Sequence, residues 1–150
     1  MSVTIHCLID SQIDSAKAVV IAGCIEFFGH PPLVFGDMDQ ISNQYTEPAG
    51  TFLVLLDDDL VVGTGAIRRL DDQTCELKRM WFLPNYRGKG HGTKMCELLF
   101  AFARSAGYRR VWLDTVPELV AANKLYHRLG FQPIDHYNDG PGTIFLQKML

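Results

Sequence analysis

Apolar residues recur at helical spacing in three stretches, which predict helices over about 12–28, 93–106 and 118–129. One face of the first stretch carries Ile13, Ala16, Val20 and Cys24. Asp10 or Ser11 is the candidate N-cap of this helix, and the run from Gly29 to Pro32 ends it, because proline cannot continue a helix. The segment 36–46 is ambiguous and is compatible with a short additional helix.

Seven short β-prone runs predict strands. They span residues 3–8, 51–56, 60–70, 74–83, 109–115, 131–134 and 143–148. Turns at 57–59 and 71–73 join the second, third and fourth runs into an antiparallel meander. The fourth run, a helix and the fifth run then form a strand–helix–strand unit, whose two strands are parallel. Gly63 and Gly65 indicate a bulge or close packing. The pattern predicts an α/β (α+β) fold with a mixed sheet.

A glycine-rich turn separates the run 74–83 from the helix that follows. It reads Tyr86-Arg87-Gly88-Lys89-Gly90-His91-Gly92-Thr93. Three glycines in five residues let the backbone turn tightly and approach a bound group. Backbone N–H groups at the start of the next helix face an anion, and Arg87 and Lys89 add positive charge. The turn therefore predicts a phosphate-bearing ligand. Its spacing fits neither the P-loop G-x-x-x-x-G-K-[ST] nor the dinucleotide pattern G-x-G-x-x-G.

The turn resembles R-x-x-G-x-G, the pyrophosphate-loop signature of the GNAT N-acetyltransferase superfamily. A second segment, Ala121-Ala122-Asn123-Lys124-Leu125-Tyr126-His127-Arg128-Leu129-Gly130-Phe131, resembles the family's A-x-x-L-Y-x-x-x-G-F. The run from Glu76 to Gly90 is also similar to the family's strand-to-loop consensus, and the resemblance covers about 50–135 well. It implies a mixed, mostly antiparallel sheet of about six to seven strands, with a parallel pair at its centre and about four flanking helices.

The resemblance implies acetyl-CoA as co-substrate. Its diphosphate would lie on the backbone amides of 88–93, and the backbone of 80–82 would follow the pantetheine arm, with one amide pointing at the thioester carbonyl. Many relatives carry an asparagine seven residues before the motif tyrosine, where this chain has Leu119. Asn123 instead shares a helix face with Tyr126 and either reaches the cofactor or faces solvent. The implied cofactor-binding residues are Met80, Trp81, Phe82, Arg87, Gly88, Lys89, Gly90, His91, Gly92, Thr93, Asn123 and Tyr126.

Three residues are candidates for catalysis. Tyr126 matches the tyrosine that protonates the leaving thiolate in the family. Because an unperturbed phenol has a pKa of ~10 and a thiol a pKa of ~8.5, the alternative is that Tyr126 only donates a hydrogen bond to the sulfur. An amine attacks only when neutral, so a base is needed. Glu76 and Asp114 both stand where family members place a carboxylate, and a water chain is the third alternative. No cysteine has a recognised nucleophile context, so direct attack in a ternary complex is expected.

The acceptor is not named by these motifs. A small amine or amino acid is the first hypothesis, and a peptide N-terminus or lysine is the alternative. Two alternatives involve no acetyl transfer. The first is a non-catalytic regulator that binds acyl-CoA, and the second is a domain whose phosphate loop binds another nucleotide. His30, His136 and Tyr137 lie in segments that are candidates for walls of the acceptor site or for surface loops.

Composition excludes several other classes. The length of 150 residues predicts one domain, and the net charge of -3 gives no support for nucleic-acid binding. The histidines are unclustered and the four cysteines lack C-x-x-C spacing, so no metal is expected and the cysteines are expected to be buried in a reduced, cytoplasmic protein. No leader-like segment or apolar run of about 18–20 residues is present, so no membrane span is expected. Apolar edge strands are compatible with a homodimer.

Overall fold

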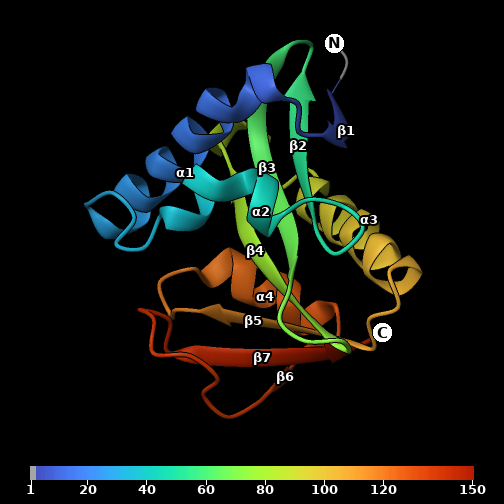
Figure 1. The fold of residues 1–150 in the computed structure, drawn as a ribbon. Coiled ribbons are helices and arrows are strands. Elements are labelled where there is room, and N and C mark those ends of the chain that lie inside the picture. Colours follow the sequence, from blue (N-terminus) through green and yellow to red (C-terminus); the bar gives the residue numbers. More distant parts are fainter. Residues whose placement is uncertain (1–2) are drawn as a thin grey trace.

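The computed structural model describes residues 3–150, which form one seven-stranded sheet with helices on both faces (Figure 1). The strands are β1 (Val3–Cys7), β2 (Thr51–Asp57), β3 (Leu60–Arg69), β4 (Thr74–Phe82), β5 (Arg110–Thr115), β6 (Gln132–Pro133) and β7 (Ile144–Met149). The α-helices are α1 (Ile13–Phe28), α2 (Ile41–Gln44), α3 (His91–Ser105) and α4 (Val120–Arg128), with 3-10 turns at Asp10–Gln12, Gly36–Gln40 and Pro84–Tyr86.

The sheet order is β1-β2-β3-β4-β5-β7-β6, and among the described strands only the central pair β4 and β5 is parallel. The predicted fold class is therefore confirmed. The parallel pair is short, since only residues 74–76 of β4 face residues 110–112 of β5. β4 continues for six more residues without that neighbour. The two central strands thus split, which leaves one edge of β4 open.

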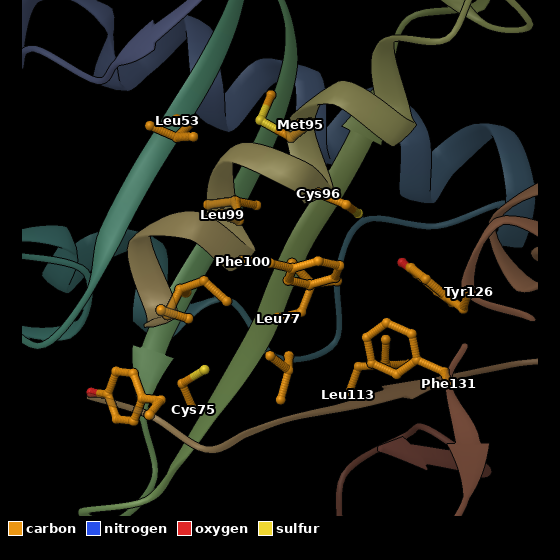
Figure 2. Close-up of a cluster of buried hydrophobic side chains, with 14 of the residues drawn as sticks. Leu53, Cys75, Leu77, Met95, Cys96, Leu99, Phe100, Leu113, Tyr126 and Phe131 are labelled. Atoms are coloured by element: carbon orange, nitrogen blue, oxygen red, sulfur yellow. The ribbon is translucent and has the colours of Figure 1, made fainter. Parts of the chain in front are cut away.

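Two apolar clusters lie on opposite faces of the sheet. One joins α3 and the end of α4 to the sheet and includes Leu77, Leu99, Phe100 and Tyr126 (Figure 2). The other lies under α1 and α2 and includes Val20 and Phe52. Because strand side chains alternate between faces, β2 and β3 each contribute buried residues to both clusters. Helices therefore cover both faces of this half of the sheet.

A bulge re-aims β4 beside the split. Thr64 faces Trp81 but Ala66 faces Lys78, so two residues of β4 oppose Gly65. One of them, Arg79, has a positive φ of 58°. A Cβ on Gly65 would come within 2.8 Å of methionine side chains from β4 and α3, so both expected reasons for a glycine here are confirmed.

Local details differ from the sequence predictions in four places. The 3-10 turn precedes α1, and the Gln12 side chain accepts the N–H of Ile9 at 3.1 Å, so neither Asp10 nor Ser11 caps that helix. The helix expected from residue 93 begins at His91, because Gly90 adopts φ 85° as its N-cap. The strand expected over 131–134 contains only two residues. Cys7 is exposed because it lies on edge strand β1, whereas the other three cysteines are buried.

Candidate active site

The turn before α3 presents a row of free backbone donors. Gly88 and Gly90 have φ values of 71° and 85°, which an L-residue rarely adopts. A Cβ at either position would meet no atom within 4 Å, so the turn faces open space. In the part of the chain that the structure describes, none of the N–H groups of residues 88–93 donates to a protein acceptor. Six free amides at the positive end of a 15-residue helix are an arrangement suited to binding an anion.

A cleft of about 340 Å³ connects this turn to the split between β4 and β5. Its walls come from the end of β4, the glycine turn and α4. Its lining residues are Phe27, Met80, Trp81, Phe82, Tyr86, Arg87, Gly88, Gly90, His91, Gly92, Thr93, Leu119, Ala121, Ala122, Lys124, Leu125, Tyr126 and Arg128. The cleft brings the two sequence motifs together. Lys89 and Asn123, both predicted to contact the cofactor, are absent from this lining.

The open edge of β4 supplies backbone groups to the same cleft. Leu83 donates its N–H to the Val62 carbonyl at 2.9 Å, toward β3. Because successive residues of a strand point their backbone groups to opposite sides, those of Phe82 point into the split. The Phe82 carbonyl there accepts a hydrogen bond from Arg87 Nε at 2.8 Å. An extended ligand can therefore align with β4 as a further strand would.

Arg87 has partners within the protein. Its guanidinium donates to both carboxylate oxygens of Glu26 on α1, at 2.6 and 2.8 Å, and lies 5.0 Å from the centre of the Phe27 ring. The guanidinium hydrogen bond from Arg87 holds the pKa of Glu26 below its usual value. Arg87 therefore joins α1 to the glycine turn at the mouth of the cleft. Glu26 gave no sign of this role in the sequence.

Tyr126 is 7% exposed and lines the cleft from α4. Its ring packs edge-on against Phe131 at 5.6 Å, within the core cluster shown in Figure 2. Its hydroxyl makes no hydrogen bond within residues 3–150. Because no fully buried side-chain polar atom in that part of the chain lacks a hydrogen-bond partner, the hydroxyl is not fully enclosed and reaches the cleft. Burial, reinforced by Cys96 and Asp114, raises the pKa of Tyr126 well above its usual value. The hydroxyl is therefore a neutral donor.

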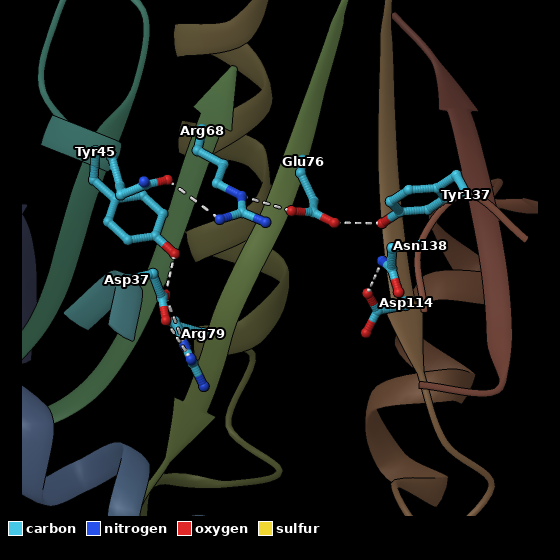
Figure 3. Close-up of polar contacts among 9 residues, drawn as sticks. Asp37, Tyr45, Arg68, Glu76, Arg79, Asp114, Tyr137 and Asn138 are labelled. Atoms are coloured by element: carbon cyan, nitrogen blue, oxygen red, sulfur yellow. Dashed lines mark hydrogen bonds and ion pairs between the residues drawn. The ribbon is translucent and has the colours of Figure 1, made fainter. Parts of the chain in front are cut away.

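Glu76 is fully buried at the point where β4 and β5 separate. Its Oε1 accepts from Arg68 Nε at 2.7 Å, and its Oε2 accepts from the Tyr137 hydroxyl at 2.6 Å (Figure 3). From the sequence, Tyr137 was a candidate only for a wall of the acceptor site, and Arg68 was not identified. The predicted antiparallel meander contained the signal for Arg68, because positions 68 and 76 face each other across the 70–73 turn.

Asp114 lies on β5, in the middle of the same region. Its Oδ2 accepts from Asn138 Nδ2 at 2.8 Å. A Cβ on Gly142 would come within 2.6 Å of Asp114 Oδ1, so only glycine fits beside this carboxylate. Asp114 also contributes to the raised pKa of both Tyr126 and Tyr137. Its charge therefore acts both on the tyrosine of the cleft and on the tyrosine that is paired with Glu76.

Asn123 serves the junction between β5 and α4. Its Oδ1 accepts from the Thr115 hydroxyl and its Nδ2 donates to the Val116 carbonyl, both at 2.9 Å. Neither of the two alternatives considered from the sequence, cofactor contact or a solvent-facing side chain, describes this arrangement. The side chain fixes the start of α4, which carries Tyr126.

The buried cysteines are inert. Burial raises the pKa of Cys75 to about 12 and that of Cys96 to about 12. Cys75 lies on β4, and its side chain is fully buried in the core cluster under α3. A thiol with so high a pKa is not a nucleophile at neutral pH, so neither residue supports a covalent acyl-enzyme.

Within residues 3–150 no group of three histidine, cysteine or acidic side chains is placed to hold a metal. None of the helices described has the length and apolar character needed to cross a bilayer.

The model of the acetyltransferase (GNAT) family matches residues 20–131, three quarters of the chain, including both motifs and the whole cleft. The chain belongs to the GNAT family. It is 36% identical over 103 residues to the uncharacterized N-acetyltransferase YjgM of Escherichia coli, covering 67% of this chain and 62% of that relative. It is 40% identical over 119 residues to the N-acetylaspartate synthetase of Rattus norvegicus, covering 76% of this chain and 40% of that enzyme.

Solved structures of GNAT proteins share the fold over nearly the whole chain. An acetyltransferase of the GNAT family from Staphylococcus aureus superposes with a TM-score of 0.91 at 18% identity, covering 99% of each chain. The PaiA N-acetyltransferase of Thermoplasma acidophilum, solved in complex with coenzyme A, superposes with a TM-score of 0.81 at 14% identity, covering 100% of each chain. At these identities the likeness shows the fold alone.

Proposed function

We propose that this chain transfers an acetyl group from acetyl-CoA to a primary amine, by direct attack in a ternary complex. The observation that carries the proposal is the row of free amides over 88–93, which continues into the open edge of β4. The first feature suits a diphosphate and the second suits an extended amide-bearing arm. Coenzyme A contains both groups in this order.

The residues of the cleft and the two carboxylates near it would have the following roles. The amides of 88–93 would hold the diphosphate, and the backbone of 80–82 would align the pantetheine arm and offer an N–H to the thioester carbonyl. Acetyl-CoA, when bound, supplies the activated acyl group. Tyr126 would donate a hydrogen bond to the sulfur, since its raised pKa makes complete proton transfer to a thiolate unfavourable. Glu76 and Asp114 are the candidate bases.

The acceptor that we propose is a small amine that carries a carboxylate, in the class of amino acids. The shared identity with an N-acetylaspartate synthetase supports this class, although the chain spans less than half of that enzyme. On the sheet face that carries Glu76 and Asp114, Lys78 is partly exposed and makes no ion pair within residues 3–150. Its ammonium is available to a carboxylate. The alternative acceptor is a protein N-terminus or lysine.

An amine panel with detection of free thiol tests the proposal. The panel contains L-aspartate, other amino acids, polyamines, a peptide with a free N-terminus and a lysine peptide. We expect amine-dependent release of coenzyme A, strongest with an amino acid. Tight binding of acetyl-CoA without release by any amine would instead make the chain an acyl-CoA-binding regulator. Thermal stabilisation by ATP or NAD but not by acetyl-CoA would remove the cofactor assignment itself.

A further inference from the structure

The Glu76 carboxylate is closed to direct contact with an acceptor. The residue is fully buried, and each of its two oxygens already accepts a hydrogen bond, one from Arg68 at 2.7 Å and one from Tyr137 at 2.6 Å. Arg68 is itself held by Gln44 Oε1 at 3.2 Å. Because solvent does not reach this carboxylate, the two donors are the polar side chains in contact with it through which a proton from the split can arrive. A guanidinium cannot accept a proton, which leaves the phenol.

Tyr137 is suited to this task by its position. It belongs to the segment between β6 and β7 and crosses β5 to reach Glu76 (Figure 3). Its ring is held by Trp112 at 4.9 Å and by Phe145 at 5.2 Å, and the residue is only half-buried. The hydroxyl donates its one proton to Glu76, and its oxygen keeps a lone pair that can accept from an amine.

The charged groups around Tyr137 together disfavour ionisation of the phenol, although one of them acts in the opposite sense. Glu76 on β4 and Asp114 on β5 are carboxylates, and Arg68 on β3 is a cation that acts on the phenol in the opposite sense. His136 precedes Tyr137 in its own segment, and its ring lies tilted against Phe145. Burial and the Glu76 carboxylate raise the pKa of Tyr137 far above its usual value, with a further contribution from Asp114. The phenol thus remains protonated between transfers.

We infer that Tyr137 is the proton relay between the acceptor amine and Glu76. The acceptor ammonium N–H gives its proton to the Tyr137 oxygen as the Tyr137 hydroxyl proton passes to Glu76 Oε2. The nitrogen keeps the electron pair of the broken N–H bond, and Glu76 becomes a neutral acid that is still hydrogen-bonded to Arg68. Charge is conserved and no further reactant is needed. This inference rests on the proposed function and adds to it a residue and a proton route.

The test compares Tyr137→Phe with Tyr45→Phe. Tyr45 is a matched control, because its hydroxyl also donates to a carboxylate, Asp37, that is paired with an arginine on the same face of the sheet, and it does not contact Glu76 (Figure 3). kcat/KM is measured from about pH 6.5 upward with acetyl-CoA and the most active amine of the panel, beginning with L-aspartate. Acetyl-CoA affinity and melting temperature are measured for each variant.

For Tyr137→Phe we expect kcat/KM to fall by about 10²-fold near pH 7, as for loss of a general-base path, with acetyl-CoA affinity unchanged. The defect should shrink as the pH approaches the pKa of the acceptor amine, because a neutral amine needs no relay before it attacks. Tyr45→Phe should show a small change that is equal at every pH. A Tyr137→Phe defect that is constant with pH, or no defect, overturns the relay and leaves the proposed function standing. Wild-type protein that acetylates no amine overturns both.

Discussion

Replacing Gly90 by aspartate should separate cofactor binding from folding. Gly90 lines the cleft and has φ 85°, and a Cβ there would meet nothing within 4 Å. Gly90→Asn is the matched control, since it has the same shape without the charge. Asparagine and aspartate are also the two residues, after glycine, that best tolerate this backbone conformation. Any difference between the two variants therefore reports on charge.

The magnitude follows from the geometry of the turn. Each substitution should cost about 1 kcal/mol of stability through backbone strain, and the melting temperatures should agree within a few degrees. A carboxylate about 6 Å from a phosphate charge, at an effective dielectric constant of about 20, is repelled by about 2.8 kcal/mol, or about 100-fold in Kd. The turn is exposed, so ionic screening lowers this to between about 10-fold and 100-fold in 0.15 M salt.

Titration calorimetry provides the assay, with quenching of Trp81 fluorescence as a second signal because that side chain lines the cleft. Acetyl-CoA is compared with acetylpantetheine, which lacks the diphosphate. We expect Gly90→Asp to bind acetyl-CoA more weakly than Gly90→Asn, and the gap to narrow as salt is raised. With acetylpantetheine the two variants should not differ. Equal acetyl-CoA affinity in the two variants would refute the position of the diphosphate on residues 88–93.

Three further outcomes are expected. Tyr126→Phe should lower kcat by about 10- to 100-fold at every pH, because one hydrogen bond to a charged group is lost, and Kd for acetyl-CoA should not change. Normal turnover of this variant would mean that Tyr126 serves only in core packing. Asn123→Ala should lower the free energy of unfolding, measured in urea, by about 1–3 kcal/mol, because the Thr115 hydroxyl and the Val116 carbonyl lose their hydrogen-bond partner. A loss of acetyl-CoA affinity without a loss of stability would contradict this expectation. Asp37→Asn should cost about 3 kcal/mol at pH 7, because it leaves Arg79 buried without its counter-charge. Burial opposes ionisation of Asp37, but Arg79 outweighs burial and lowers the pKa of Asp37. The stabilisation by ionised Asp37 is therefore fully present above about pH 4 and is lost as the pH falls through the pKa of Asp37 in the folded protein. The difference in free energy of unfolding between wild type and Asp37→Asn, measured in urea, should therefore be smaller at pH 3 than at pH 7.

Local sequence carried much of the fold. The helices after residues 12 and 90, the meander and the strand–helix–strand unit all follow from periodicity and turn residues within about 15 positions of each other. The glycine turn was recognisable for the same reason, because its function depends on consecutive backbone amides. These amides need only a tight turn and a helix start, both of which are encoded by neighbouring residues.

The polar centre of the site was decided by tertiary structure. Glu76 could be named from the sequence, but its burial and its contact with Tyr137 join residues 61 positions apart through packing of β4, β5 and the β6–β7 segment. Helix spacing left two alternatives for Asn123, contact with the cofactor or a solvent-facing side chain, whereas packing of α4 against β5 turned it to Thr115. Periodicity predicts which face a side chain occupies, and only the register between strands and the docking of distant segments determine what it touches there.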